Sequence, residues 1–176
     1  MLGEPYILPF KPGDKVIELG GGAVPMFRPN VDVRPGPATD LVWDFNTPST
    51  MKDAQFQGIY CQYAIEHISW RNVRAFIAEC HRLLAPGGIA VFIMPNTYEQ
   101  AKKAAASDDW GDDIPSMFFG DLDYPENSHR AGWSPKSAER MFREQGFWDV
   151  KTQSHPATIT DMILEARKSA AVIVRG

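Results

Sequence analysis

The stretch VIELGGGAVP, residues 16–25, places three consecutive glycines directly after a short apolar run. Glycines at such a point let the backbone approach a ligand closely. The spacing departs from the dinucleotide motif G-x-G-x-x-G, because Gly20 and Gly22 are followed by Pro25 at the third position. Glu18, just before the glycines, would repel a phosphate but not a positive centre, and it can orient the loop amides. We therefore expect Glu18, Gly20 and Gly22 to surround a cationic ligand that lacks phosphates.

Two further acids follow the next two apolar runs. Asp32 stands in VDV, and Asp44 stands in LVWDF beside Phe45. In an open α/β sheet, ligands bind at the carboxyl ends of the strands, and a carboxylate there can accept both hydroxyl groups of a ribose. A second carboxylate can accept an amino hydrogen of adenine. Three acids at successive strand ends predict an adenosine site, with Asp32 at the ribose and Asp44 at the base.

Two histidines are candidates for proton transfer. His67 lies in AIEHIS, next to Glu66, and His129 lies in a polar loop before a helix. A histidine that faces a ligand can act as a general base near neutral pH, although loop histidines are often solvent-exposed and a positioning role is common. The two cysteines, Cys61 and Cys80, have no metal-ligand spacing, so no metal is expected.

The elements that must position these residues follow from apolar runs between turn signals. Strands are predicted at 15–19, 31–33, 41–43, 56–62, 89–95, 147–153 and 159–167, and helices at 71–84 and 134–145. The strands are almost continuously apolar, which suits burial on both faces of a parallel sheet. Their alternation with helices predicts an α/β layer fold.

The connections after the first two predicted strands are short and rich in proline. GGGAVPMFRPN and RPGPAT are too short to hold the usual crossover helix, so these helices are expected to be shortened or absent. One face of the sheet would then be bare. Either the N-terminal arm, residues 1–12, or a second subunit is expected to cover it. The second alternative predicts a homodimer.

Composition narrows the class of protein. The 176 residues are 44% hydrophobic, which suits one domain spanning 1–176. The net charge of -4 argues against a nucleic-acid partner. The beginning of the chain does not resemble a signal peptide, and no apolar run is long enough to span a membrane. With only two cysteines, a cytoplasmic protein is expected.

The segment 97–133 is the longest without a predicted strand, although EQAKKAAA within it has a helical composition. It interleaves aromatic and acidic residues, and we expect it to form a lid that selects the acceptor. The alternative is a solvated insertion whose aromatic residues complete the core. Arg130, beside His129, could clamp a carboxylate or a phosphate.

In combination, the motifs ELGGG, VDVRPGP, DLVWDFNTP, IYCQYAIEHI and LLAPGGIAVFIMPN resemble those of class I S-adenosylmethionine-dependent methyltransferases. The chain is similar to small, truncated members of the type 11 group. The resemblance covers residues 13–96 closely and 129–167 more loosely. It implies a Rossmann-like sheet of seven strands, mostly parallel with the last antiparallel. It also implies S-adenosylmethionine as cofactor, S-adenosylhomocysteine as product, and a small-molecule acceptor with an oxygen or nitrogen nucleophile.

The resemblance also implies roles for single residues. Glu18, Gly20 and Gly22 would surround the methionine part and ribose, Asp32 the ribose hydroxyls, Asp44 and Phe45 the adenine edge, and Gln62 and Tyr63 the amino-acid end. It places the Glu66–His67 pair beside the cofactor. The chain departs from the family pattern at Val24, where a third glycine is usual.

Three other functions remain open. A nicotinamide-dependent oxidoreductase would share the sheet and Asp32, but the missing third glycine and Glu18 argue against it. A nucleic-acid amino-methyltransferase would carry a [D/N]-P-P-[Y/F]-like motif where this chain reads CQYAIEH. A non-catalytic subunit or sensor that binds the cofactor or its product is the third.

Overall fold

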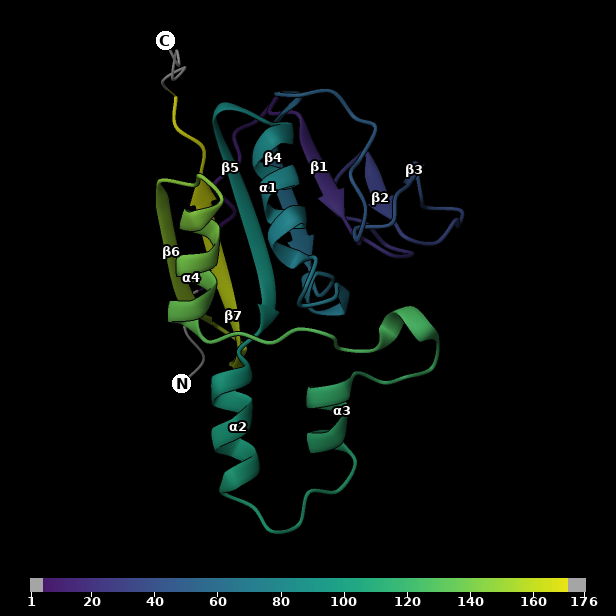
Figure 1. The fold of residues 1–176 in the computed structure, drawn as a ribbon, viewed down its shortest axis with the longest axis vertical. Helices are drawn as coiled ribbons and strands as arrows, with labels where there is room; N and C mark the ends of the chain where they lie inside the picture. The colour runs from purple at the N-terminus through teal and green to yellow at the C-terminus, as the bar shows by residue number, and fades with distance from the viewer. Residues whose placement is uncertain (1–4, 171–176) are drawn as a thin grey trace.

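A computed structural model describes residues 5–170 of the chain. One seven-stranded sheet runs through them, with the strand order β3-β2-β1-β4-β5-β7-β6 (Figure 1). Neighbouring strands are parallel except where β7 pairs with β5 and with β6. The prediction of a mostly parallel, Rossmann-like sheet whose last strand is antiparallel is confirmed.

The strands are β1 (Val16–Leu19), β2 (Asn30–Asp32), β3 (Leu41–Val42), β4 (Phe56–Gln62), β5 (Leu84–Pro95), β6 (Asp149–His155) and β7 (Thr158–Arg167). The helices are α1 (Val73–Leu83), α2 (Thr97–Ala105), α3 (Asp113–Phe119) and α4 (Pro135–Glu144), with 3₁₀ turns η1 (Ile65–His67) and η2 (Pro125–Asn127). Two predictions need correction. Strand β5 begins directly after α1, at Leu84, whereas a strand was predicted only from residue 89, and α3 lies where no helix was predicted.

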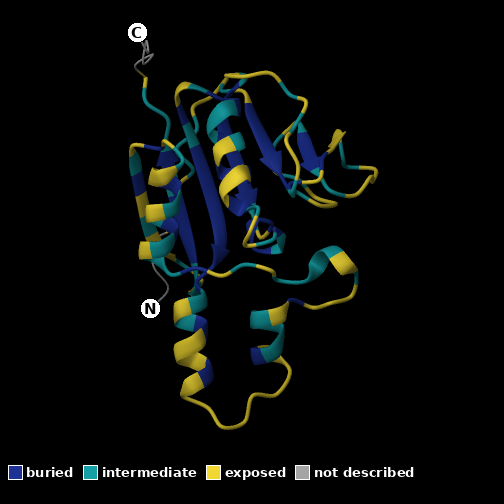
Figure 2. Cartoon of the chain, viewed as in Figure 1, coloured by how far each residue is buried: buried dark blue, intermediate teal, exposed yellow. Residues whose placement is uncertain are grey.

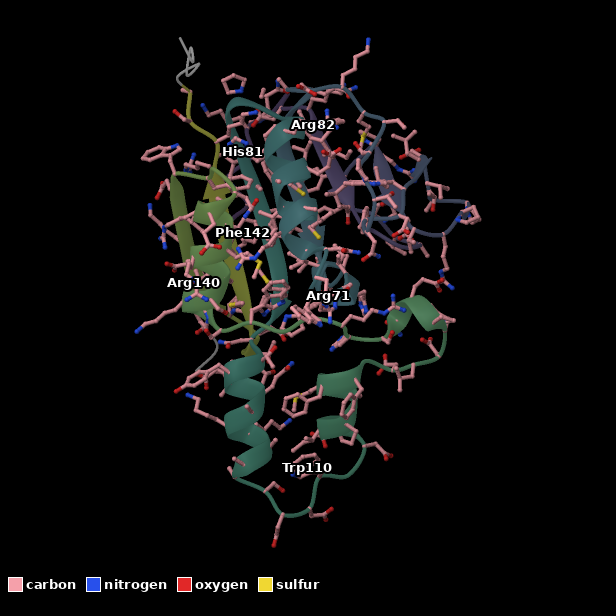
Figure 3. The ribbon with its side chains drawn as sticks, in the orientation of Figure 1. Arg71, His81, Arg82, Trp110, Arg140 and Phe142 are labelled. Atoms are coloured by element: carbon pink, nitrogen blue, oxygen red, sulfur yellow. The ribbon has the colours of Figure 1, made fainter. Side chains whose placement is uncertain are left out.

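Helices α1 and α4 lie on the near face of the sheet in Figure 1. The buried side of α1 includes Val73, Phe76 and Cys80, as its apolar spacing predicts. A capping box at Ser134 starts α4, whose Phe142 packs on Phe92 of β5 with ring centroids 4.9 Å apart (Figure 3). Burial is concentrated in the strands and in the helix sides that face them (Figure 2). No helix in the described part of the chain is long and apolar enough to cross a membrane.

Between β1 and β4 the structure contains no helix, as the short connections predict. The N-terminal arm covers the other face of the sheet instead. Its side chains join a second apolar cluster, formed by Tyr6, Leu8, Phe10 and Phe27 with Val16, Tyr60, Ile89, Val91, Ile93 and Ile163. Gly58 makes room for Phe10, because a Cβ there would lie 2.7 Å from its ring. The arm therefore covers the face for which a second subunit was the other expected cover. The homodimer stays a prediction.

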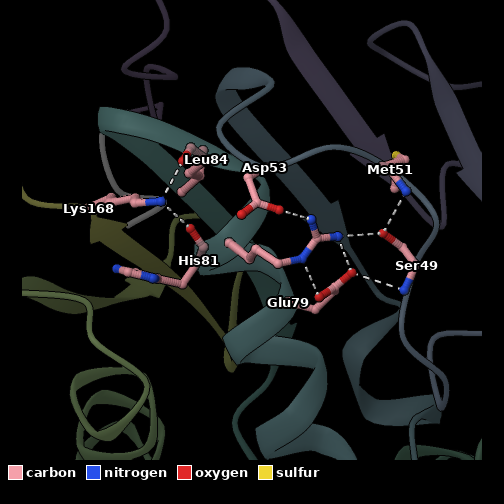
Figure 4. Close-up of polar contacts among 8 residues, drawn as sticks. Ser49, Met51, Asp53, Glu79, His81, Leu84 and Lys168 are labelled. Carbon is pink, nitrogen blue, oxygen red and sulfur yellow. Dashed lines mark hydrogen bonds and ion pairs between the residues drawn. The ribbon is translucent and has the colours of Figure 1, made fainter. Parts of the chain in front are cut away.

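A polar network holds the long loop between β3 and β4 against α1 (Figure 4). Arg82 donates hydrogen bonds to Glu79 Oε2 at 2.8 Å and to Ser49 Oγ at 3.1 Å, and it also pairs with Asp53. The backbone N–H of Ser49 donates to Glu79 Oε1 at 2.9 Å. These contacts lower the pKa of Glu79 to about 2, chiefly through the hydrogen bonds from Arg82. The network thus holds in place the loop between β3 and β4, which contains no helix that could pack against the sheet.

Candidate functional site

A cavity of about 320 Å³ lies at the carboxyl ends of β1, β2 and β4. The residues that line it are Gly20, Gly22, Asp32, Val33, Arg34, Asp44, Phe45, Asn46, Tyr63, Ala64, His67, Ile68, Tyr124, Glu126, Asn127 and Arg130. Eight of the candidate residues from the sequence, Arg130 included, are therefore brought together. In Figure 1 the segment that carries η2 passes below the strand ends and faces this edge of the sheet.

The glycine loop is shaped by positive φ angles. Gly20 has φ +78°, and a Cβ there would lie 2.3 Å from the Cβ of Ala64. Gly22 has φ +57° and open space around its Cα. Only glycine adopts such angles at little cost, so the loop backbone can line the cavity at these two positions.

Asp32 anchors this loop from the end of β2. Its Oδ2 accepts a hydrogen bond from the Gly22 N–H at 3.2 Å, and its Oδ1 accepts one from the Arg34 N–H at 3.1 Å. A carboxylate oxygen has two acceptor sites, so each oxygen can accept a further hydrogen bond from a ligand hydroxyl. The half-buried side chain can thus bind a diol while it remains fixed by the backbone.

Asp44 and Phe45 form the adjacent wall. Phe45 is buried, and its ring packs on Trp43 and Phe76 with centroid separations of 4.9 and 5.2 Å. Asp44 is exposed, and its Oδ1 accepts hydrogen bonds from the backbone and side-chain nitrogens of Asn46 at 2.9 and 3.0 Å. An aromatic edge beside a fixed carboxylate suits a planar ring that has an amino group.

Glu18 and Gln62 do not line the cavity. Glu18 is buried behind the glycine loop, where its Oε2 accepts a hydrogen bond from the Phe27 N–H at 2.6 Å. Burial raises the pKa of Glu18. Gln62 accepts a hydrogen bond from the Tyr60 hydroxyl at 2.5 Å. Both side chains therefore bond to residues of the arm-side cluster, where they support the strand ends from behind.

Tyr63 lines the cavity in a strained conformation. Its φ is +49°, which a non-glycine residue rarely adopts. Its hydroxyl donates a hydrogen bond to Asp161 Oδ2 at 2.8 Å, and burial is the main cause that raises the pKa of Tyr63. The contact ties the end of β4 to β7 and fixes this wall of the cavity. The strain at a cavity wall is a feature typical of functional sites.

His67 and His129 lie side by side, with ring centroids 5.1 Å apart. His67 faces the first cavity, whereas His129 lines a second cavity with Phe118 and Met117. Burial lowers the pKa of both histidines, which favours neutral rings that can accept a proton. Arg130, the residue after His129, lines both cavities.

The segment 120–130 supplies cavity residues that the sequence did not identify as cofactor ligands. Tyr124, Glu126 and Asn127 come from the η2 region. The guanidinium carbon of Arg34 lies 3.6 Å from the ring centroid of Tyr124, which joins the loop after β2 to this segment. The signal in the sequence was the interleaving of aromatic and acidic residues in 97–133, which predicted a lid but no particular contact.

The aromatic residues of the segment 97–133 lie in different parts of the structure. Tyr124 lines the first cavity and Phe118 the second, whereas Trp133 is buried in the main core. Trp110, at the far end of the α2–α3 pair in Figure 3, donates a hydrogen bond to the carbonyl of Ala104 at 3.1 Å. The segment 97–133 therefore combines features of both alternatives, since some of its aromatic residues line cavities and others complete a core.

Residues 5–152 match the family model described as "Methyltransferase domain". The chain belongs to this family. With the sheet described above, it is a class I S-adenosylmethionine-dependent methyltransferase by family and fold. Among proteins of curated function, none matches this sequence significantly.

Solved methyltransferases share the fold at low sequence identity. A SAM-dependent methyltransferase from Thermotoga maritima is 15% identical with a TM-score of 0.61, over 90% of this chain and 84% of the other. One from Archaeoglobus fulgidus is 12% identical with a TM-score of 0.61, over 87% and 85%. The 1,6-didemethyltoxoflavin-N1-methyltransferase of Burkholderia thailandensis, solved with its substrate and S-adenosylhomocysteine, is 14% identical with a TM-score of 0.58, over 89% and 71%.

Proposed function

We propose that the protein transfers a methyl group from S-adenosylmethionine to an oxygen or nitrogen atom of a small molecule. The observation that carries this proposal is the single cavity in which Gly20, Gly22, Asp32, Asp44 and Phe45 meet at the strand ends. Asp32 can accept hydrogen bonds from a diol, and Phe45 with Asp44 provides an aromatic edge next to a carboxylate. The glycine loop provides backbone that lines the cavity. The absence of a helix after β1 in the described chain leaves no helix N-terminus for a pyrophosphate.

The position of the second cavity supports an acceptor site beside the cofactor. It is lined by the ends of α2 and α3 and by the segment before α4, including Phe118, His129 and Gly132. Its walls combine apolar and polar groups, as sites for small molecules do. The methyl group would therefore be transferred between the two cavities, near His67 and near Arg130, which lines both.

Methyl transfer requires the protein to align the acceptor and the cofactor more than to activate them. A lone pair of the acceptor attacks the methyl carbon, and the carbon–sulfur bond breaks with its electron pair on sulfur, which gives S-adenosylhomocysteine. The acceptor proton passes to a base or to water. A neutral ring of His67 or His129 can accept that proton if the acceptor is a hydroxyl or an ammonium group. The protein would otherwise hold the two molecules in line and exclude water.

The test is methyl transfer from S-adenosylmethionine labelled in the methyl group to mixtures of small hydroxyl- and amine-bearing metabolites. We expect the label to appear in one class of acceptor, with stoichiometric formation of S-adenosylhomocysteine. Tight cofactor binding without any transfer would favour the alternative, a sensor or non-catalytic subunit. Lack of cofactor binding would contradict both.

A further inference from the structure

Three side chains with metal-ligating atoms lie close together next to Arg130, which lines both cavities. Glu66, His67 and His129 each offer one such atom, and these atoms all lie within 4.8 Å of one another. His67 faces the first cavity and His129 the second. We propose that these three residues bind a divalent transition-metal ion, which holds the methyl acceptor next to the cofactor.

The carboxylate of Glu66 is the first argument for a cation. Glu66 is only 1% exposed, and its Oε2 has no hydrogen-bond partner among the described residues. A buried carboxylate oxygen without a partner is costly, and a bound cation would satisfy it. The carbonyl of Glu66 accepts hydrogen bonds from the N–H groups of Arg130 and Ala131 at 2.7 and 3.1 Å. These contacts hold the Glu66 backbone against the loop that carries His129.

The orientation of the two histidines is the second argument. Nδ1 of His67 lies 3.2 Å from the carbonyl oxygen of Ser128, and Nδ1 of His129 lies 3.0 Å from that of Met117. A carbonyl only accepts, so each Nδ1 must carry the proton and donate it. In the neutral ring, the lone pair then lies on Nε2, which is the arrangement found in metal-ligating histidines.

The donor set limits the metal. Two imidazole nitrogens and one carboxylate oxygen suit first-row ions such as Mn²⁺, Fe²⁺, Co²⁺ or Zn²⁺, and they leave coordination positions for a substrate. Ligands at about 2.1 Å from such an ion are about 3.0–3.4 Å apart, so binding would draw the three side chains closer together.

The use of this ion in methyl transfer rests on the proposed function. A cation lowers the pKa of a hydroxyl group bound to it, as it does for bound water. The acceptor would then be a hydroxyl compound, and His67 and His129 would act as ligands and not as bases.

The test uses the full-length chain, free of any affinity tag and treated with EDTA, titrated with Co²⁺ alone. We expect saturable visible absorption at one Co²⁺ per chain, and Mn²⁺ that competes with it. Glu66→Gln and His129→Gln should each weaken Co²⁺ binding by more than about tenfold. The control His155→Gln, at the last residue of β6, should bind Co²⁺ as the native chain does.

The outcomes separate this proposal from the proposed function. Circular dichroism and S-adenosylhomocysteine binding would show that the variants are folded. Weak or unsaturable Co²⁺ binding, or binding that is equal in Glu66→Gln and in the native chain, would overturn the metal site. The methyl-transfer proposal would stand in that case if the metal-free protein binds the cofactor. Specific Co²⁺ binding without any cofactor binding would contradict only the methyl-transfer proposal.

Discussion

The backbone N–H of Gly22 donates a hydrogen bond to Oδ2 of Asp32 at 3.2 Å, and this contact joins the loop after β1 to the end of β2. The contact connects the glycine loop and the carboxylate at the end of β2, which are the two sequence features that most strongly indicated an adenosine site. The glycine supplies a backbone conformation, and the carboxylate holds it while retaining acceptor sites for a ligand. Changes at either residue should therefore affect ligand binding more than folding.

The two glycines of the loop should respond differently to alanine. In Gly20→Ala, a positive φ and a Cβ 2.3 Å from Ala64 act together, and we expect a loss of about 3 kcal/mol in the free energy of unfolding. In Gly22→Ala only the φ angle is unfavourable, and the loss should be about 1 kcal/mol. Urea denaturation measures both. Equal losses would show that Ala64 does not pack as described.

His129→Ala should lower the methyl-transfer rate by about 100-fold or more while cofactor affinity changes little. The reason is its place in the second cavity, with its ring centroid 5.1 Å from that of His67, which lines the first cavity. Steady-state turnover together with S-adenosylhomocysteine calorimetry measures the two effects. His155→Ala, at the end of β6, is the matched control. Unchanged turnover would remove His129 from the mechanism.

The Arg82 network should make stability depend on pH. Since the pKa of Glu79 falls from 4.5 to about 2 on folding, its contribution is complete above pH 4.5 and is lost as the pH falls toward 2. We expect Glu79→Gln to lower the free energy of unfolding by on the order of 2 kcal/mol at pH 7, allowing for partial exposure. The difference from the native chain should shrink at pH 2.5. A difference independent of pH would contradict this assignment.

The arm should stabilise the fold through Phe10. Phe10→Ala removes the ring that packs over Gly58, and we expect a loss of about 2–3 kcal/mol in the free energy of unfolding. Ile7→Ala in the same arm should change it by less than about 0.5 kcal/mol, because Ile7 is 83% exposed. If both variants behave alike, the arm does not cover the sheet in solution.

Much of the fold follows from local signals in the sequence. The glycines and acids at strand ends could be placed because parallel strands bring their carboxyl ends to one edge. The helices predicted at 71–84 and 134–145 likewise match α1 and α4 to within two residues at each end. The missing helices followed from the length and proline content of the connections.

The differences between the predicted and the observed cavity residues also have physical causes. Successive side chains of a strand point to opposite faces, so Glu18 and Gln62 fall on the arm side together with Val16 and Tyr60. The position of a residue within a motif does not by itself show to which face of the sheet its side chain points. The contacts of Tyr124 and Asn127 depend on the path of a long connection after α3, and no periodicity specifies that path.

The most direct test of the cofactor site is isothermal titration calorimetry of the native chain and of Asp32→Ala with S-adenosylmethionine, S-adenosylhomocysteine and NAD. We predict that the native chain binds the first two and not NAD. Asp32→Ala should bind them at least about tenfold more weakly, because a charged hydrogen-bond acceptor is lost. Asp149→Ala, at the start of the edge strand β6, should bind them as the native chain does. Binding of NAD alone, or equal affinities for native chain and Asp32→Ala, would contradict the account.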